Sequence, residues 1–198
     1  MYRFLIWLAF ALAITACDRT VQAPKPRAYP RVIYPERGFQ LFDKDYCQFS
    51  FQYPAYAQVE RDSSPDPNMP EHSPCWFNLY IPAFDCRLHC SYYEIGKEKS
   101  FETLKQDAFE LVDWHNKKAN YIEEMAIKNG RGAEGLAFSI QGPAATPFQF
   151  YLTDNKTHFF RASLYFNTKI NPDSLAPLYD FVLQDVMQII DTFEWSAK

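Results

Sequence analysis

Apolar and polar residues alternate strictly in "YCQFSFQYP", residues 46–54. One face carries Cys47, Phe49, Phe51 and Tyr53, and polar residues occupy the other, which predicts a half-buried strand. Further strands are predicted at residues 75–81, 86–95, 121–127, 134–141, 148–153 and 158–167. Short turns join them in pairs, at residues 82–85, 129–130 and 154–155. Strands joined by such short turns are antiparallel neighbours.

Two stretches change to helical spacing. The first covers residues 100–119, where Ser100 is a natural N-cap and Glu102 favours the first turn. Its apolar positions are Phe101, Leu104, Ala108, Leu111 and His115. The second helix covers residues 171–195, with Pro177 near its first turn, where proline is tolerated. Its apolar stripe is Leu175, Leu178, Val182, Val186, Ile189 and Phe193.

The order of the elements is strands, a helix, a strand meander and a closing helix. Because helices must cover the apolar face of the sheet, this order predicts an α+β domain, an antiparallel sheet with covering helices. The early "FSFQYP" strand and the final helix ending "FEW" make the arrangement similar to the PsbP/Mog1-type α/β/α sandwich. A fold of this kind does not by itself specify a function.

The first 16 residues have the parts of a signal peptide. Arg3 precedes an apolar run from Phe4 to Ile14, which is shorter than the roughly 20 residues that a membrane-spanning helix needs. The run ends in "ITAC", and an aliphatic residue, two small residues and a cysteine resemble the bacterial lipoprotein signal. That resemblance implies cleavage before Cys17 and acylation of its sulfur and amino group. The alternative is an ordinary signal peptide with an accidental cysteine.

The remaining chain, Cys17 to Lys198, has the length of one domain. Prolines at 24, 26, 30 and 35 interrupt helices and central strands, so residues 17–39 are predicted to form an extended tether. At about 3.1 Å per residue, residues 18–35 would reach roughly 50–60 Å. The domain proper is expected over residues 40–198. Alternatively, residues 28–34 lie along the domain as an edge strand.

Composition excludes one class of partner and leaves another open. The chain has a formal net charge of −4 and no run of lysine or arginine, so nucleic acid is not expected as a partner. Aromatic residues make up 18% of the sequence. They can build a dense core, or they can leave aromatic surface for another protein.

Four cysteines follow Cys17, and an even number in an exported protein indicates disulfides. Cys86 and Cys90 are four residues apart on one strand, roughly 13 Å, whereas a disulfide spans at most about 7 Å. The preferred bond is Cys47–Cys75, which would close the excursion at residues 54–74. A competing scheme joins Cys47 and Cys75 separately to Cys86 and Cys90.

No catalytic or metal-binding motif is found, so neither an enzyme nor a cofactor is expected. In "CRLHC" the alternation places His89 on the face opposite Cys86 and Cys90, which prevents the three from binding one ion. An enzyme or a ligand-binding module acting on envelope sugars or lipids remains the alternative. It would need a cleft in which His115, Asp154 or His158 meets another polar group. A redox role for the two cysteines would need an accessible thiol.

The last strand pair offers a candidate interface. Its core face carries Phe148, Phe150, Leu152, Phe160, Ala162, Leu164 and Phe166. The opposite face carries Gln149, Tyr151, Phe159, Arg161 and Tyr165. Tyrosine and arginine are enriched at binding hot spots, so this second set is the candidate interface. The alternative is that a helix covers this face.

Several segments carry a family resemblance: "CQFSFQYPAYAQV", "CWFNLYIP" and above all "FQFYLTDNKTHFFRASLYFN" with "PDSLAP". In these the chain resembles the GldD family of gliding-motility lipoproteins of the Bacteroidota. The resemblance implies an envelope lipoprotein needed for gliding and linked to type IX secretion. The tether, the lack of a catalytic motif and the outward aromatic positions favour a scaffold or assembly factor without enzymatic activity, whose partners are other envelope proteins of the gliding and secretion apparatus.

The resemblance also bears on the cysteines and on location. The family has a cysteine at the starts of the two strands that hold Cys47 and Cys75, which supports their pairing, whereas Cys86 and Cys90 depart from its pattern. Asp18 follows the lipidated cysteine without an acidic run. A run of that kind would suggest export to the cell surface, so the domain is expected to face the periplasm, held by its lipid at the outer membrane.

Overall fold

The computed structural model describes residues 31–61, 75–167 and 172–196. The predicted signal peptide, Cys17 and the loop at 63–74 lie outside these residues. Residues Ile33–Lys198 form one compact unit.

The larger sheet has seven antiparallel strands in the order β3-β4-β5-β9-β8-β7-β6. Three hairpins, β4–β5, β6–β7 and β8–β9, supply six of the strands, because the turns between them are short. The strands are β3 (Gln58–Arg61), β4 (Phe77–Ile81), β5 (Cys86–Glu94), β6 (Tyr121–Lys128), β7 (Glu134–Gln141), β8 (Phe148–Thr153) and β9 (His158–Phe166).

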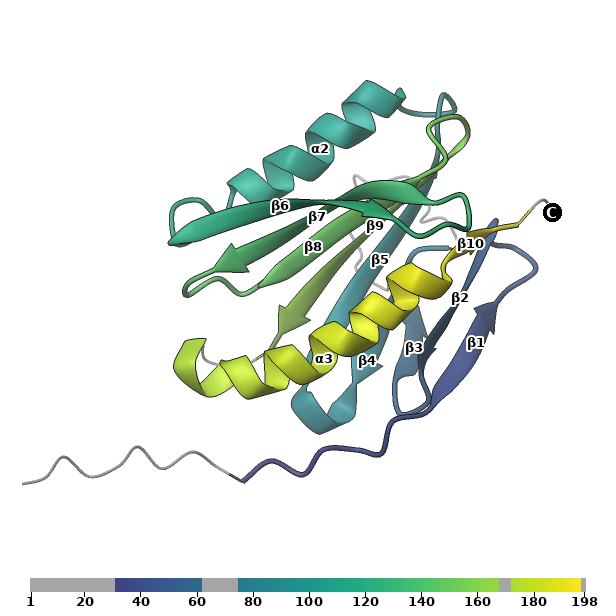
Figure 1. The fold of residues 1–198 in the computed structure, drawn as a ribbon. Coiled ribbons are helices and arrows are strands. Elements are labelled where there is room, and N and C mark those ends of the chain that lie inside the picture. The colour runs from purple at the N-terminus through teal and green to yellow at the C-terminus, as the bar shows by residue number, and fades with distance from the viewer. Residues whose placement is uncertain (1–30, 62–74, 168–171, 197–198) are drawn as a thin grey trace, which may run out of the picture. The chain divides into compact units, whose positions relative to one another are not determined.

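A smaller antiparallel sheet has the order β1-β2-β10. Its strands are β1 (Phe39–Asp43), β2 (Phe49–Pro54) and β10 (Glu194–Trp195). The two helices are α2 (Phe101–Asp113) and α3 (Pro172–Thr192). Figure 1 shows α2 on one face of the seven-stranded sheet and α3 with the smaller sheet on the other. All six residues of β8 are buried, because both faces of this strand are covered.

Closely packed phenylalanine rings fill the space between the two sheets. The ring centroids of Phe42 and Phe77 are 4.5 Å apart, and those of Phe49 and Phe160 are 5.1 Å apart. Phe193, which follows α3, lies 5.0 Å from Phe160. These five side chains are at most 3% exposed. The cluster therefore joins the smaller sheet, the larger sheet and the end of α3 into one core, and aromatic pairs at these distances stabilise beyond the area they bury.

Helix α2 covers the other face through its apolar stripe. The Ser100 side chain accepts a hydrogen bond from the Thr103 N–H and caps the helix, as predicted. A second buried cluster lies beneath the helix; it consists of Leu104, Ala108, Val112, Phe138, Ile140, Ala144, Tyr151 and Phe159.

The predicted fold class, an α+β domain with an antiparallel sheet and covering helices, is confirmed. Three short strands were not predicted: β1, β3 and β10. Both residues of β10 were assigned to the closing helix, which in fact ends at Thr192. Helix α2 ends at Asp113 rather than near residue 119. Pro177 lies inside α3 rather than in its first turn.

The structure joins Cys47 and Cys75 by a disulfide, the pairing preferred from the sequence, with Cα atoms 5.6 Å apart. Cys47 precedes β2 in the smaller sheet and Cys75 precedes β4 in the larger one, so the bond links the two sheets covalently. A bond that closes a loop of this length is expected to stabilise by about 3–4 kcal/mol in the chain-entropy model.

The close approach of β7 and β8 at Gly135 generates a stability prediction. A Cβ atom at Gly135 would lie 1.9 Å from the Tyr151 carbonyl oxygen, so Gly135→Ala forces the two strands apart. At Gly38 an added Cβ meets only the Ala55 Cβ, at 3.7 Å. We expect Gly135→Ala to lower the free energy of unfolding by about 2–4 kcal/mol. Gly38→Ala should be neutral or slightly stabilising, because it restricts only the unfolded chain.

Urea denaturation of the two variants beside the parent protein measures this difference. Equal stabilities of the two alanine variants would show that β7 and β8 are not this close.

Candidate functional site

The structure corrects the candidate interface on β8 and β9. Gln149, Tyr151 and Phe159 are 4%, 4% and 1% exposed, so a partner cannot reach them. Arg161 is half-buried, and burial lowers the pKa of its guanidinium. Of the five predicted residues, Tyr165 alone is exposed, at 37%. The prediction of an exposed face is therefore wrong for Gln149, Tyr151 and Phe159.

Helix α2 is the reason for this burial. Tyr151 and Phe159 stack with centroids 5.0 Å apart and belong to the cluster under the helix. A helix is about 10–12 Å wide with its side chains, whereas seven strands spaced by about 4.8 Å form a sheet about 29 Å across. One helix therefore covers part of this face, and the part nearer β4 and β5 stays accessible among the described residues.

We call this accessible part the open sheet face; its residues are Asn78, Tyr80, Arg87, His89 and Tyr165. The hairpin β4–β5 places Tyr80 directly opposite Arg87, and Asn78 opposite His89. Strand β9 adds Tyr165 opposite Arg87 on the other side. All five side chains share one parity, that of the α2 face. His89 is exposed, and Asn78, Tyr80 and Arg87 are half-buried.

Polar contacts hold the open sheet face in one arrangement. The Arg87 guanidinium lies 3.9 Å from the centroid of the Tyr80 ring. Its Nε is 3.1 Å from Glu60 Oε2, and its terminal nitrogen is 3.5 Å from Asp85 Oδ1. His89 Nδ1 is 2.7 Å from Asn78 Oδ1. Because its aromatic and basic groups are already positioned, this surface would lose little side-chain entropy on binding.

The sequence contained a signal for this surface. The predicted turn at 82–85 fixes the register of the hairpin, and that register places Tyr80 beside Arg87. Parity alone did not show which end of the sheet α2 leaves uncovered.

The buried side chain of Asp185 on α3 is the centre of a polar cluster. Asp185 is 1% exposed, and its carboxylate accepts hydrogen bonds from Arg37 Nε, at 3.3 Å, and from the Tyr56 hydroxyl. Arg37 also donates to the Phe181 carbonyl oxygen, at 2.9 Å, and its guanidinium lies 4.2 Å from the centroid of the Phe181 ring. Burial raises the pKa of Asp185, more than Tyr56 and Arg37 lower it.

This cluster fixes the chain entering the domain, in the segment Tyr34–Arg37. The Tyr34 ring lies 4.8 Å from Phe181 and 5.9 Å from Phe84. The segment was assigned to the tether, yet its side chains are bound to α3. Arg37 and Asp185 are 148 positions apart in the sequence, so no local pattern indicates that they meet.

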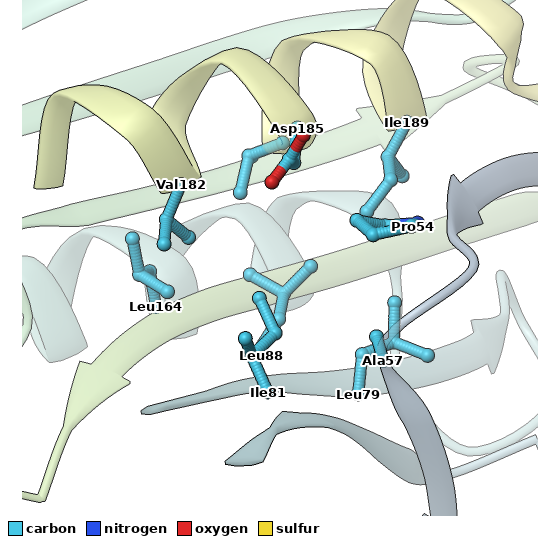
Figure 2. Close-up of a pocket in the computed structure, with 10 residues that line it drawn as sticks. Pro54, Ala57, Leu79, Ile81, Leu88, Leu164, Val182, Asp185 and Ile189 are labelled. Atoms are coloured by element: carbon cyan, nitrogen blue, oxygen red, sulfur yellow. The ribbon is translucent and has the colours of Figure 1, made fainter. Parts of the chain in front are cut away.

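Beside Asp185 lies a cavity of about 10 Å³ between α3 and the sheet. Figure 2 shows the carboxylate among apolar side chains, with Val182 and Ile189 on the same helix and Leu88 and Leu164 on strands below. Ligand sites for small molecules measure roughly 300–1,000 Å³, so this cavity cannot hold a sugar or a lipid chain.

His115 and His158 do not converge, and Asp154 lies beside His158, whose backbone N–H donates to its carboxylate. His115 Nε2 is 2.6 Å from Thr146 Oγ1, before β8, whereas His158 follows β8 and its Nδ1 is 2.7 Å from the Tyr92 hydroxyl. A strand of six residues is about 20 Å long, so the two histidines lie at opposite ends of it. Asp154 accepts three backbone hydrogen bonds in its own turn, which lower the pKa of its carboxyl although burial opposes this. These residues act as turn and packing groups.

Cys86 and Cys90 are buried thiols on β5. Burial raises the pKa of the Cys86 thiol to about 12, and Asp85 and Asp185 add to the rise. Burial alone raises the pKa of Cys90. The reactive form of a cysteine is the thiolate, so neither thiol has the environment of a redox centre.

Neither a membrane-spanning helix nor a metal-binding cluster is found among the described residues. None of the helices described is long and apolar enough to cross a membrane. Across residues 31–61, 75–167 and 172–196, no group of three or more His, Cys, Asp or Glu side chains is placed to hold a metal ion.

The sequence matches the family described as gliding motility lipoprotein GldD, over residues 19–195. A comparison with curated proteins gives no match. Among solved structures, the chain is similar to the solution structure of cyanobacterial PsbP from Synechocystis sp. PCC 6803. The two share 10% sequence identity and a TM-score of 0.49, and the match covers 81% of this chain and 94% of that one.

The buried thiols generate a chemical prediction. In the native protein Cys86 and Cys90 should react with iodoacetamide at least about 100-fold more slowly than after unfolding in urea, because burial keeps both groups protonated. Mass spectrometry of samples quenched over time measures the rate. Fast labelling of either thiol in the native protein would restore the redox hypothesis.

The raised pKa of Asp185 generates a prediction about pH. The native protein takes up the proton at a higher pH than the unfolded chain, whose aspartate titrates at about 3.9. The stability that this proton uptake contributes is fully present below the unfolded-state pKa, and it is lost as pH rises through the native pKa of Asp185. The stability of the parent protein relative to Asp185→Asn, which does not titrate, should therefore fall as pH rises from about 4.

Urea denaturation at a series of pH values measures this difference. A difference that stays constant, or that grows with pH, would contradict the raised pKa.

Proposed function

Since this chain belongs to the gliding motility lipoprotein family GldD, we propose that it serves gliding as a scaffold or assembly factor without enzymatic activity, which binds other envelope proteins through its open sheet face. The family gives the role in gliding motility and the class of lipid-anchored envelope protein. The binding mode, the link to type IX secretion and the position at the membrane are our proposal.

The open sheet face is the observation that carries this proposal. Its Tyr80 and Tyr165 supply large rings, and Arg87 is held between them on the central strand of the three. Tyrosine and arginine are the residue types in which binding energy is concentrated at protein interfaces. Two acidic side chains, Glu60 and Asp85, border Arg87 and give the face a polar rim. Such a rim around aromatic groups is typical of a protein interface.

The proposed anchor is the acylated Cys17, with the domain facing the periplasm from the outer membrane. The sequence supports this placement through the "ITAC" ending of the signal and the absence of an acidic run after Cys17. Residues 18–33 would then form the tether, because Tyr34 and Arg37 are bound to α3. A proline-rich segment of this length keeps the domain within a few tens of ångströms of the membrane and lets it reach neighbouring complexes.

The open sheet face is tested by Arg87→Ala combined with Tyr165→Ala. We expect this double variant to reduce gliding strongly, with at least about tenfold less partner recovered by crosslinking, because both changes remove hot-spot groups. Both side chains are partly accessible, so the free energy of unfolding should change by less than about 1 kcal/mol. The measurement is gliding speed in a gliding strain that carries the variant as its sole copy.

Tyr46→Ala is the matched control, since Tyr46 is 52% exposed and lies outside the open sheet face. It should leave gliding intact. Normal gliding by the double variant, at normal protein level, would remove this surface as the binding site.

A further inference from the structure

The edge strand β6 is unusual in its exposure. Six of its eight residues are exposed, among them Tyr121 at 58% and Met125 at 38%. It is the last strand of the seven-stranded sheet, and among the described residues β7 is its sole partner. Strand edges of this length are commonly protected by proline, a bulge, a covering element or charged side chains. The charged side chains of β6 are Glu123, Glu124 and Lys128. β6 contains no proline and pairs with β7 in unbroken register.

The hydrogen bonds beside β6 show which backbone groups face outward. The Asn129 N–H donates to the Ala133 carbonyl oxygen, at 3.2 Å, and the Ile140 N–H donates to the Pro147 carbonyl oxygen across the next pair of strands, at 2.8 Å. In an antiparallel ladder, residues turned toward one neighbour alternate with residues turned away. Both bonds therefore assign the outward N–H and C=O groups of β6 to its even-numbered residues, Ile122, Glu124, Ala126 and Lys128.

We propose that a second copy of this chain pairs with β6, antiparallel and related by a two-fold axis at Ala126. In this register Ala126 is opposite the partner's Ala126, and Glu124 is opposite the partner's Lys128. The outward backbone groups of each copy then meet those of the other. Every contact occurs twice because a two-fold interface is self-complementary.

Charge selects this register over its neighbours. The backbone permits shifts by two residues, since only even-numbered positions pair. One shift places Glu124 opposite the partner's Glu124, and like charges directly opposite destabilise a sheet. The register between this one and the proposed one places Glu124 opposite the partner's Ala126 and Lys128 opposite the partner's Ile122. The proposed register alone of the three forms two cross-strand ion pairs.

Side chains at the interface can adopt this arrangement. Lys128 Nζ is 4.0 Å from Glu134 Oε2, at the limit of an ion pair, and its side chain is 81% exposed, so exchanging this contact costs little. On the other face of the strand, Met125 would lie opposite the partner's Ile127, which covers apolar surface that β6 now exposes. Ile122 already packs against the cluster under α2, so the pairing leaves the core unchanged.

The interface is small, because five residues of each strand overlap. Specific interfaces normally bury about 1,200–2,000 Å², and this one is smaller, so the isolated proteins should associate weakly. Lipid-anchored copies share one membrane surface, and confinement of this kind raises the effective concentration. The pairing is independent of the open sheet face, which lies at the other end of the sheet, near β4 and β5.

Cysteine crosslinking of the full-length protein in intact cells tests the register. Opposite residues in a hydrogen-bonded pair have Cα atoms about 5.5 Å apart, within the range of a disulfide. Ala126→Cys should therefore give an oxidised dimer of twice the single-chain mass. Glu124→Cys and Lys128→Cys should not dimerise when each is expressed alone, because four residues, about 13 Å, separate identical positions. Expressed together, they should crosslink to each other.

Charge reversal in the Ala126→Cys protein tests the ion pairs. Lys128→Glu should lower the dimer yield about fivefold, and adding Glu124→Lys should restore it, because the swap rebuilds both pairs with opposite sign. Leu41→Cys is the control: Leu41 is 63% exposed on the edge strand of the other sheet and should not dimerise.

Three results would overturn the proposal. The first is no dimer of Ala126→Cys at normal protein level. The second is a crosslinked product that contains a different protein, which would mean that another chain occupies the β6 edge. Equal dimer yields from Ala126→Cys and Leu41→Cys would show random collision and would also exclude the pairing.

Discussion

The packing of phenylalanine rings between the two sheets is the interaction on which the rest of the structure depends. Phe42 and Phe49 come from the smaller sheet, Phe77 and Phe160 from the larger one, and Phe193 from the end of α3. The smaller sheet is in effect the hairpin β1–β2 with the two-residue strand β10 added, and an isolated hairpin is marginally stable at best. Here it is held by these rings and by the disulfide that joins Cys47 to Cys75. Together they fix where α3 ends, and α3 in turn places Asp185 where Arg37 can reach it.

The same layered packing leaves two surfaces accessible. Helix α2 is too narrow for a seven-stranded sheet, so it buries Tyr151 and Phe159 and leaves Tyr165 beside the hairpin β4–β5. At the opposite edge, β6 exposes six of its eight residues. An envelope protein that must bind others needs accessible surface of this kind, and here it lies on rigid strands rather than on loops. Both proposed contacts therefore follow from incomplete coverage of one sheet.

Strand patterns and turns predicted most of the sandwich. Alternation and short turns identified all three hairpins of the larger sheet, because the period of two and the turn residues are local properties. The N-cap at Ser100 was equally local. The strands β1 and β3 were missed because they are short and border the proline-rich tether and the excursion at 54–74. The strand β10 was missed because it has two residues and pairs with the distant strand β2. The predicted interface on β8 and β9 was wrong for a related reason. Parity shows which side chains share a face, whereas coverage of that face depends on a helix placed elsewhere in the chain.

The fold class, the three hairpins and the family could be predicted from the sequence, because alternation, turn residues and family motifs are carried by neighbouring residues. For the cysteines the sequence favoured the bond Cys47–Cys75 and left a competing scheme open. Only the tertiary structure decided which residues of the α2 face stay accessible and that Arg37 binds Asp185 from 148 positions away. It also decided that β6 lies at the edge of the sheet. These features depend on the order of strands and on helix width. They cannot be predicted from local sequence, because burial is set by packing between segments far apart in the chain.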